Sequence, residues 1–450
     1  MSQIDNQSMI KYAQTVACYG KIEKVEGMTI EATGPDANVG DLCYIYPTRA
    51  DKAMGNGVKA EVVSIKESKV RLMPFHEISG LGPGSIVEST GETLKIPVGE
   101  ALMGRIVDGA GIPIDGKGDI KAEKYYSVHN LVSNPLTRPR IEDKINMGVK
   151  AIDGLLTCGE GQRVGIFSGS GVGKSTLLGM IARNVEADIN VIALVGERGR
   201  EVREFIERDL KEKGLERSVL VIATSDQSAM LRLKCALTAT TIAEYFKDKG
   251  KKVLLMMDSL TRFARAQREI GLATGETPIA RGYTPSLYPL LPKLLERAGR
   301  FDKGSITGIY TVLVEGDDVN EPISDEVRSI IDGHIVLSRD VAMKNHYPAI
   351  DVLASISRLM NDIVDKKHLK LAGEMRNLLS TYKTNEDLIN IGAYKKGADP
   401  KIDEAISKID KINAFLQQEV METFDYNKTV KIMFDTLQKE LNKKSGFYDI

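Results

Sequence analysis

A glycine-rich run that ends in a lysine is the part of this sequence best suited to chemistry. It stands between a strand-like run at 164–167 and a helix-like run at 177–184. Glycines let the backbone curl so that its N–H groups point at phosphate oxygens, and the next helix adds its positive end. The pattern predicts a phosphate-binding loop, although Ser168 stands where the strict motif has glycine and a ligand-free turn is the alternative. The predicted phosphate ligands are Gly169, Ser170, Gly171, Val172, Gly173, Lys174, Ser175 and Thr176.

Within this loop, two side chains are expected to do most of the binding. Lys174 is placed to reach the β- and γ-phosphates of a nucleotide, and the Ser175 hydroxyl to bind Mg²⁺. The sequence therefore predicts a nucleotide site with ATP and Mg²⁺ as ligands.

An aspartate at the end of a second apolar run predicts a further metal contact. Five apolar residues, 253–257, precede Asp258, and two more strand-like runs, 191–195 and 219–223, lie between this aspartate and the loop. A buried parallel strand has this composition, and its carboxyl end emerges where ligands bind in such sheets. Asp258 is therefore expected to hold a Mg²⁺-bound water, although aspartate is also common at ordinary strand ends.

A charged segment directly after the 191–195 strand could activate water. Glu197 is the predicted general base or water-orienting carboxylate, and Arg198 is expected to orient it or to stabilise developing charge. The alternative is a solvated charge cluster that begins the next helix. We favour that alternative for Arg200, Glu201 and Arg203.

These segments together resemble the hexameric rotary-type ATPases. The strings that carry the resemblance are the phosphate loop, GERGRE at 196–201, and the stretches 282–299, 311–339 and 346–358. The chain resembles the flagellar type III protein-export ATPases most, the virulence-secretion ATPases nearly as much, and the catalytic head of ATP synthase less. The resemblance implies an α/β P-loop (RecA-like) core with an N-terminal β-barrel and a C-terminal helical domain.

The resemblance also implies roles for residues that the motifs alone do not assign. Arg262 matches an arginine near the nucleotide, and Tyr347 matches the aromatic that stacks on adenine. Phe424 is either the second wall of that base pocket or, as we favour, a core residue. Arg358 matches an arginine finger inserted into a neighbouring subunit's site. Taken without the resemblance, Tyr347 would be ordinary packing as readily as a ligand, and Arg358 a surface charge.

Composition fits a large soluble assembly. The chain has 450 residues, of which 42% are hydrophobic and 27% charged, and its net charge of −1 gives no general attraction to nucleic acid or membrane. Its first residues have neither a basic start nor a long apolar run, so we expect a cytosolic protein. Five histidines without metal-ligand spacing argue against a transition-metal site. The cysteines lack CxxC spacing, which fits reduced thiols: Cys18, Cys43, Cys158 and Cys235.

Patterning divides the chain into four parts. Residues 1–20 could form an amphipathic helix, which in the resembling family docks a regulatory subunit, or a frayed terminus. Alternating short segments at 21–95 predict a β-barrel, 96–365 the nucleotide-binding α/β domain and 366–450 the helical domain, with an N-cap at Asp399. Residues 1–95 hold 10 Lys or Arg against 12 Asp or Glu, which is unlike a nucleic-acid-binding barrel.

The resulting expectation is an ATP-hydrolysing homohexamer that drives or assists flagellar protein export at the cytoplasmic face of a type III apparatus. Its expected partners are a regulatory subunit, a stalk-like coiled-coil protein and export cargo or chaperones. The loop 392–398 occupies the place where rotary heads touch their stalk, but it is basic where ATP synthase is acidic. The alternatives are a virulence secretion ATPase, a hexameric nucleic-acid translocase and a non-catalytic scaffold subunit.

Overall fold

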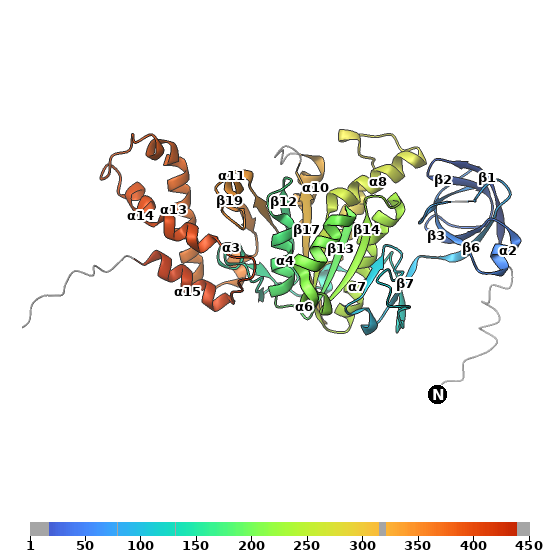
Figure 1. Ribbon diagram of the computed structural model, residues 1–450, viewed down its shortest axis with the longest axis horizontal. Helices are drawn as coiled ribbons and strands as arrows, with labels where there is room; N and C mark the ends of the chain where they lie inside the picture. Colours follow the sequence, from blue (N-terminus) through green and yellow to red (C-terminus); the bar gives the residue numbers. More distant parts are fainter. Residues whose placement is uncertain (1–17, 79, 131, 315–320, 439–450) are drawn as a thin grey trace, which may run out of the picture.

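Three parts follow one another along the long axis of the molecule. The computed structural model describes residues 18–78, 80–130, 132–314 and 321–438. A β-barrel lies at one end, a helix-covered sheet in the middle and a bundle of helices at the other end (Figure 1). This is the fold class predicted from the sequence. Most of the predicted docking tail, residues 1–17, lies outside the described residues.

The first part is a closed barrel of six antiparallel strands. Apolar residues alternate along these strands, and the inward set, such as Ile30, Val62 and Leu72, is fully buried. The order around the barrel is β1-β2-β5-β4-β3-β6, which leaves no free edge. The strands are β1 (Tyr19–Glu26), β2 (Thr29–Thr33), β3 (Asp41–Tyr46), β4 (Val58–Lys66), β5 (Lys69–Pro74) and β6 (Ile86–Thr93), with helix α2 (Arg49–Ala53) beside them.

The middle part is built on one long sheet. Its order is β19-β18-β12-β17-β15-β13-β14-β8; β18 to β8 run parallel and β19 antiparallel to β18. The strands are β8 (Ile106–Asp108), β12 (Arg163–Ser168), β13 (Ile189–Glu197), β14 (Ser218–Thr224), β15 (Lys252–Asp258), β17 (Ser305–Leu313), β18 (Gly333–Leu337) and β19 (Ile350–Ser357). The carboxyl ends of the parallel strands therefore share one edge, the edge where ligands bind in such sheets.

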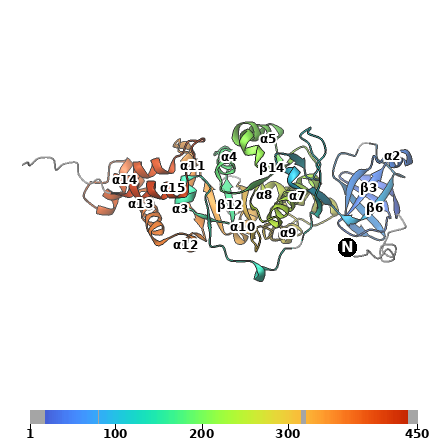
Figure 2. The same cartoon turned by 90° about the horizontal axis from the view of Figure 1, so that it is seen from below.

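Helices cover both faces of this sheet, because successive side chains of each strand point to opposite sides. Along β13, Val191 and Val195 belong to one hydrophobic core, whereas Ile192 and Leu194 belong to the other. Figure 2 shows α4 and α5 on one side of the strands and α9 and α10 on the other. The covering helices are α3 (Lys150–Leu155), α4 (Lys174–Asn184), α5 (Gly199–Glu204), α6 (Lys211–Glu216), α7 (Ala229–Asp248), α8 (Leu260–Thr274), α9 (Leu287–Leu295) and α10 (Pro322–Ile330).

The last part is helical, and two of its helices begin at aspartates. The Asp365 side chain accepts a hydrogen bond from the backbone N–H of His368 at 2.8 Å, and Asp399 accepts one from Lys401 at 2.8 Å, so both act as N-caps. The helices are α13 (Lys366–Asn390), α14 (Pro400–Leu416) and α15 (Tyr426–Leu437). Among the described residues, no helix has the length and apolar character that crossing a membrane requires.

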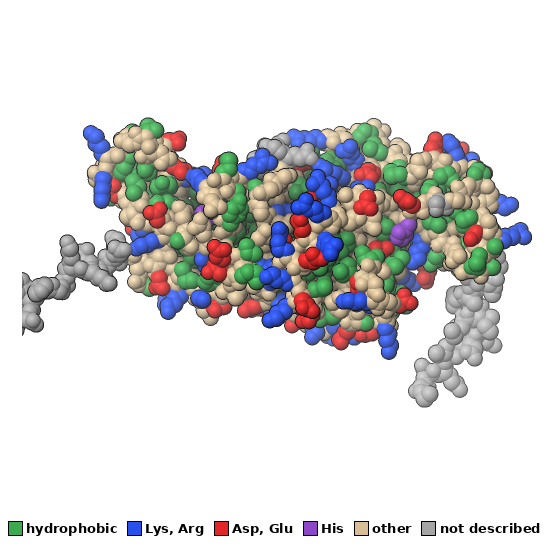
Figure 3. Space-filling model, in the orientation of Figure 1, with side chains coloured by type: hydrophobic (Ala, Val, Ile, Leu, Met, Phe, Trp, Pro, Cys, Tyr) green, Lys and Arg blue, Asp and Glu red, His purple; other side chains and the backbone are tan. Residues whose placement is uncertain are grey.

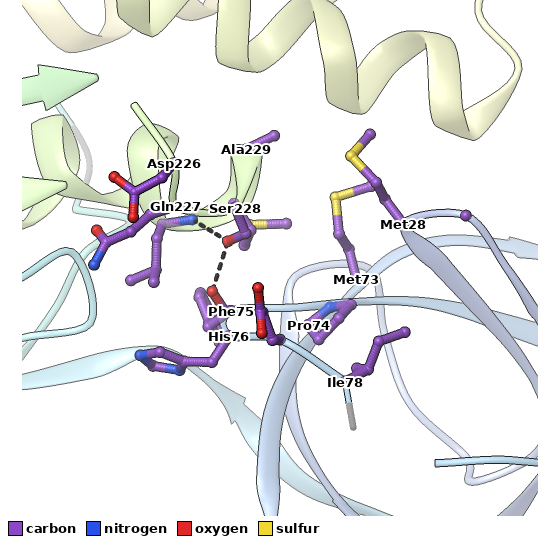
Figure 4. Close-up of a pocket in the computed structure, with 14 residues that line it drawn as sticks. Met28, Met73, Pro74, Phe75, His76, Ile78, Asp226, Gln227, Ser228 and Ala229 are labelled. Atoms are coloured by element: carbon purple, nitrogen blue, oxygen red, sulfur yellow. Dashed lines mark hydrogen bonds between the residues drawn. The ribbon is translucent and has the colours of Figure 1, made fainter. Parts of the chain in front are cut away.

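A serine joins the barrel to the middle part. The Ser228 hydroxyl caps α7 by accepting from the Leu231 N–H at 3.1 Å, and it donates to the carbonyl oxygen of Phe75 at 2.6 Å (Figure 4). A pocket of about 600 Å³ opens at this junction between Met28, Met73 and the start of α7. None of the site residues predicted from the sequence lines it.

A buried ion pair crosses the same junction. Lys234 on α7 places its Nζ atom 2.6 Å from Oε2 of Glu61 on β4, and their side chains are only 1% and 10% exposed. The Nε2 atom of His129 lies 2.9 Å from the same ammonium group. Neither charge has bulk water to compensate it, so each depends on the other.

Replacing Lys234 with methionine is therefore expected to destabilise the protein by about 3–5 kcal/mol, because Glu61 would be left buried without its partner. Thermal unfolding should show a clearly lower midpoint. The double variant Lys234→Met/Glu61→Leu should recover most of the loss, and Lys213→Met, a matched change at an exposed lysine, should cost little. An unchanged midpoint in Lys234→Met would show that the pair contributes nothing.

Candidate active site

Three functional side chains predicted from distant parts of the sequence meet at the carboxyl edge of the sheet. The phosphate loop follows β12, Asp258 ends β15 and Glu197 ends β13. The Nζ atom of Lys174 lies 2.6 Å from Oδ1 of Asp258 and 3.8 Å from Oε1 of Glu197. One buried ammonium group is thus held between two carboxylates.

The phosphate loop takes its shape from two glycines. Gly171 and Gly173 have φ angles of 79° and 88°, in the left-handed region that side chains disfavour. Lys174, Ser175 and Thr176 then form the first turn of α4, so free backbone N–H groups at this end face the loop. Ser168 is the last residue of strand β12, and its carbonyl oxygen accepts from Val314 at 3.0 Å. Because this position is extended, it does not need the glycine of the strict motif.

The charges at this edge shift the pKa values of the groups involved. Burial lowers the pKa of Lys174, but the carboxylates of Asp258 and Glu197 more than offset it, so its pKa is raised. Burial raises the pKa of Glu197 to about 7; Asp258 adds to the rise, and Lys174 opposes it. A carboxyl group with a pKa near neutrality is suited to accept a proton in a reaction at physiological pH.

The residues present fit a nucleotide with Mg²⁺. Among the described residues, Oε1 of Glu197 and Nε of Arg262 are buried and have no hydrogen-bond partner. An unpaired guanidinium nitrogen beside a phosphate loop suits an anion, and an unpaired carboxylate oxygen suits a water molecule. Arg262 also packs against Gly196, next to Glu197: a Cβ built on Gly196 would lie 3.2 Å from Cβ of Arg262.

A metal ion would have to share its ligands with the nucleotide. Within the described ranges, no group of three or more His, Cys, Asp or Glu side chains could hold one alone. Mg²⁺ commonly binds through one or two protein oxygens together with substrate phosphates and water. Ser175 and Asp258 are the residues that would supply those oxygens here.

Two aromatic residues, Tyr347 and Phe424, were predicted to form the base pocket. Tyr347 lies beside the phosphate loop, since a Cβ built on Gly173 would be 3.6 Å from Cδ1 of its ring. Tyr347 is 43% exposed, and an exposed aromatic ring can stack on a base. Phe424 is half-buried under the ammonium groups of Lys150 and Lys428, at 4.7 and 4.8 Å from its ring centre.

Arg198 lies at the surface. Its side chain is 75% exposed and pairs with Glu201 at 3.4 Å. Glu201 also contributes to the raised pKa of Glu197. The Glu201 side chain is 48% exposed, as expected of a solvated charge, but it also affects the proposed base.

Arg358 lies at the opposite edge of the sheet from its own phosphate loop. It follows β19, whose last residue, Ser357, pairs with Gly333 at the start of β18, while Leu337 at the other end of β18 pairs with Ser168. β12 has six residues, so its ends lie roughly 17 Å apart at about 3.3 Å per residue. Arg358 therefore cannot serve the site of its own chain.

Comparison with known proteins decides the family. Residues 22–91 and 148–357 match the β-barrel and nucleotide-binding domains of the ATP synthase alpha/beta family, and 364–435 match the C-terminal domain of the type III secretion ATPase EscN. A flagellum-specific ATP synthase of Bacillus subtilis is 57% identical over 89% of this chain and 91% of its own length. The chain belongs to the flagellar and type III secretion ATPase family. It is an ATP-hydrolysing enzyme.

Other members of this family agree with the assignment. A type 3 secretion system ATPase of Sinorhizobium fredii is 48% identical over 94% of this chain and 93% of its own length. The assembled ATPase EscN of enteropathogenic E. coli superposes with a TM-score of 0.88 at 50% identity, covering 93% of this chain and all of that one. EscN in complex with its central stalk EscO gives a TM-score of 0.86 at 48% identity, over 93% of this chain and all of EscN.

The raised pKa of Glu197 gives a pH dependence for this ATPase. Below a pH of about 7 the carboxyl group of the free enzyme is protonated and cannot accept a proton, so kcat/KM for MgATP should fall as the pH drops through that value. In Glu201→Gln the apparent pKa should be lower, because Glu201 raises the pKa of Glu197. A flat profile between about pH 5.5 and 8.5 would remove Glu197 from the role of base.

Sequence reasoning missed two residues of the site. Thr311 on β17 donates a hydrogen bond from its hydroxyl to Oδ1 of Asp258 at 2.7 Å and so holds that carboxylate. Gln418 donates its backbone N–H to the carbonyl oxygen of Tyr347 at 3.0 Å, while its side chain binds Gly148 and Lys150. Thr311 stands in one of the strings that resemble the family, but only the pairing of β17 with β15 shows what it contacts.

Proposed function

We propose that this ATPase works as a homohexamer with six sites between subunits and drives or assists export of flagellar proteins through a type III apparatus. The observation that carries the proposal is the placement of Arg358 at the edge away from its own phosphate loop. Since the same chain carries Glu197, Lys174 and Arg358, identical subunits can complete one another's sites. The similarity to an assembled EscN supports the same arrangement.

In this proposal each group has one task. The loop amides and Lys174 hold the phosphates, and Arg262 adds positive charge beside Glu197. Ser175 and Asp258 would hold Mg²⁺, which neutralises phosphate charge when bound. Glu197 orients the attacking water and accepts its proton. Tyr347 stacks on the adenine base, and Phe424 is the proposed second wall of the base pocket. Arg358 of the neighbouring subunit stabilises the negative charge that develops on the phosphates, an effect worth about 10³- to 10⁵-fold in rate.

Mixing two inactive variants tests the shared site. Arg358→Ala subunits lack the finger but keep Glu197, and Glu197→Gln subunits lack the base but keep the finger. Each variant alone should be nearly inactive, whereas the mixture should regain activity, because some interfaces pair an intact Glu197 with an intact Arg358. No recovery, in mixtures that sizing shows to be assembled, would contradict a site shared between subunits.

A central stalk and a regulatory subunit are the proposed partners, beside export cargo or chaperones. The turn 391–399 at the tip of α13 and α14 carries the exposed Lys395 and Lys396, and Lys and Arg side chains gather at this tip in Figure 3. A basic tip suits a stalk with acidic side chains. EscN was solved in complex with a central stalk, which supports a stalk partner for this chain. The proposed location is the cytosol, peripheral at the export apparatus.

Deleting residues 1–18 is expected to abolish capture of the regulatory subunit, because the apolar stripe of this segment precedes strand β1 and serves no predicted core. Circular dichroism and ATPase activity should stay close to those of the full chain. Capture at full affinity would place the binding surface elsewhere, and a truncated chain that unfolds would show that the segment is structural.

A hexameric nucleic-acid translocase is the alternative outside the export family. It would need a basic barrel with aromatic side chains for stacking, whereas residues 1–95 hold 10 Lys or Arg and 12 Asp or Glu. ATPase activity stimulated by single-stranded DNA or RNA would favour that alternative. A virulence export role is separated from flagellar export by identifying what co-purifies with the intact chain.

A further inference from the structure

The backbone around Arg358, here called its root (Ser357, Arg358 and the Asp332 carbonyl group), is held by one buried amide side chain. Gln162 is fully buried and directly precedes β12. Its Oε1 atom accepts from the Gly159 N–H at 2.7 Å, and its Nε2 atom donates to the carbonyl oxygen of Asp332 at 3.0 Å and to Oγ of Ser357 at 3.2 Å. Gln162 thus contacts the residue before the finger and the residue that anchors it.

The anchor acts on Arg358 directly. The backbone N–H of Arg358 donates to the same carbonyl oxygen of Asp332 at 3.0 Å. The carboxylate of Asp332 is fixed by two hydrogen bonds from the Arg163 guanidinium, each 3.0 Å long. Ser357 is fixed as well, because its hydroxyl donates to the carbonyl oxygen of Thr157 at 2.8 Å. Every polar group of Gln162 that faces the finger therefore has a partner that is itself held in place.

The backbone around Arg358 is closely packed at Gly333, where even one added carbon atom would clash. A Cβ built on Gly333 would lie 2.7 Å from the carbonyl oxygen of Ile356 and 3.1 Å from Nε2 of Gln162. The Arg358 side chain itself is exposed, and its Nη2 atom donates a hydrogen bond to the carbonyl oxygen of Arg328 at 3.3 Å. The backbone at Arg358 is thus fixed, and only its side chain is free to reach across an interface.

We propose that Gln162 is a positioning residue for the arginine that each subunit lends to its neighbour's site. This rests on the proposed function, in which Arg358 acts in a neighbouring subunit. A long side chain that must meet reacting phosphates across an interface depends on where its Cα atom is held, and a misplacement of about 1 Å can cost about 10²-fold in rate. Gln162→Met keeps the volume but removes both hydrogen bonds to the root, so kcat should fall about 10- to 100-fold with little change in ATP affinity.

Mixed assemblies separate positioning from a general structural role. In the mixture of Arg358→Ala and Glu197→Gln subunits, only the Glu197→Gln subunits supply a finger. Adding Gln162→Met to those subunits should reduce the recovered activity about 10- to 100-fold. Adding Gln162→Met to the Arg358→Ala subunits should leave the recovery unchanged, because their finger is already absent. Gln438→Met, the same change at an exposed glutamine, serves as the control in both backgrounds.

Two other outcomes would overturn the proposal, and they are distinguishable. An equal loss from either background would show that Gln162 only supports the fold, and no loss from either would show that it is not needed. Absence of recovery in the reference mixture would instead refute the shared site itself. If Gln162→Met prevents assembly, Ser357→Ala removes one of the two contacts at the strand end, and its smaller loss should show the same dependence on which subunit carries it.

Discussion

Replacing Glu197 with glutamine is expected to reduce ATP turnover about 10²- to 10⁴-fold while leaving ATP affinity nearly unchanged. Glutamine keeps the shape of the side chain but cannot accept a proton, and the ground-state phosphates are bound by Lys174 and the loop amides instead. Steady-state hydrolysis and equilibrium binding of a fluorescent ATP analogue would measure the two effects separately.

Glu201→Gln is the matched control, since it makes the same chemical change at a carboxylate that raises the pKa of Glu197. It should shift the pH profile but keep most of the activity. Near-wild-type hydrolysis in Glu197→Gln would refute the assignment of the base. A large loss of ATP binding in that variant would mean that Glu197 acts on the bound nucleotide rather than on water.

Replacing Lys174 with alanine should abolish measurable turnover, a loss of at least about 10³-fold, and also weaken ATP binding. Lys174 contacts Asp258 and is predicted to bind the phosphates, so its removal affects the ground state as well as the reaction. Hydrogen bonds to charged groups contribute about 1.5–3 kcal/mol, which corresponds to roughly a 10- to 100-fold rise in Kd.

Lys213→Ala, at an exposed lysine of α6, is the control and should leave both quantities unchanged. Both the Lys174→Ala and Glu197→Gln proteins should still assemble, which sizing can check. If Lys174→Ala kept its affinity for ATP and lost only turnover, the loop backbone alone would account for ground-state binding.

The phosphate loop could be predicted from the sequence because its chemistry depends on residues that are adjacent in the chain. The same holds for Asp258 and Glu197, since each ends an apolar strand and parallel strands place their ends at one edge. The three-part fold followed from patterning and from the resemblance. The predicted N-cap at Asp399 is a local feature of the same kind.

Contacts that depend on pairing between strands could not be predicted. Thr311 reaches Asp258 only because β17 lies beside β15 in a particular register. Gln418 donates a hydrogen bond to Tyr347, which lies 71 positions earlier in the chain. Gln162 donates one to Ser357, which lies 195 positions later. No local sequence pattern marks such distant partners. The effect of Glu201 on the pKa of Glu197 was missed because an exposed helix start normally carries solvated charge.

The most direct test of the shared site is specific activity measured across a range of protein concentrations, with the mass of the assembly determined at each one. Because an isolated subunit lacks its neighbour's Arg358, turnover per chain should be very low where the protein is monomeric and should rise steeply as larger assemblies form. Turnover per chain that stays constant through the monomeric range would show that one subunit contains a complete site.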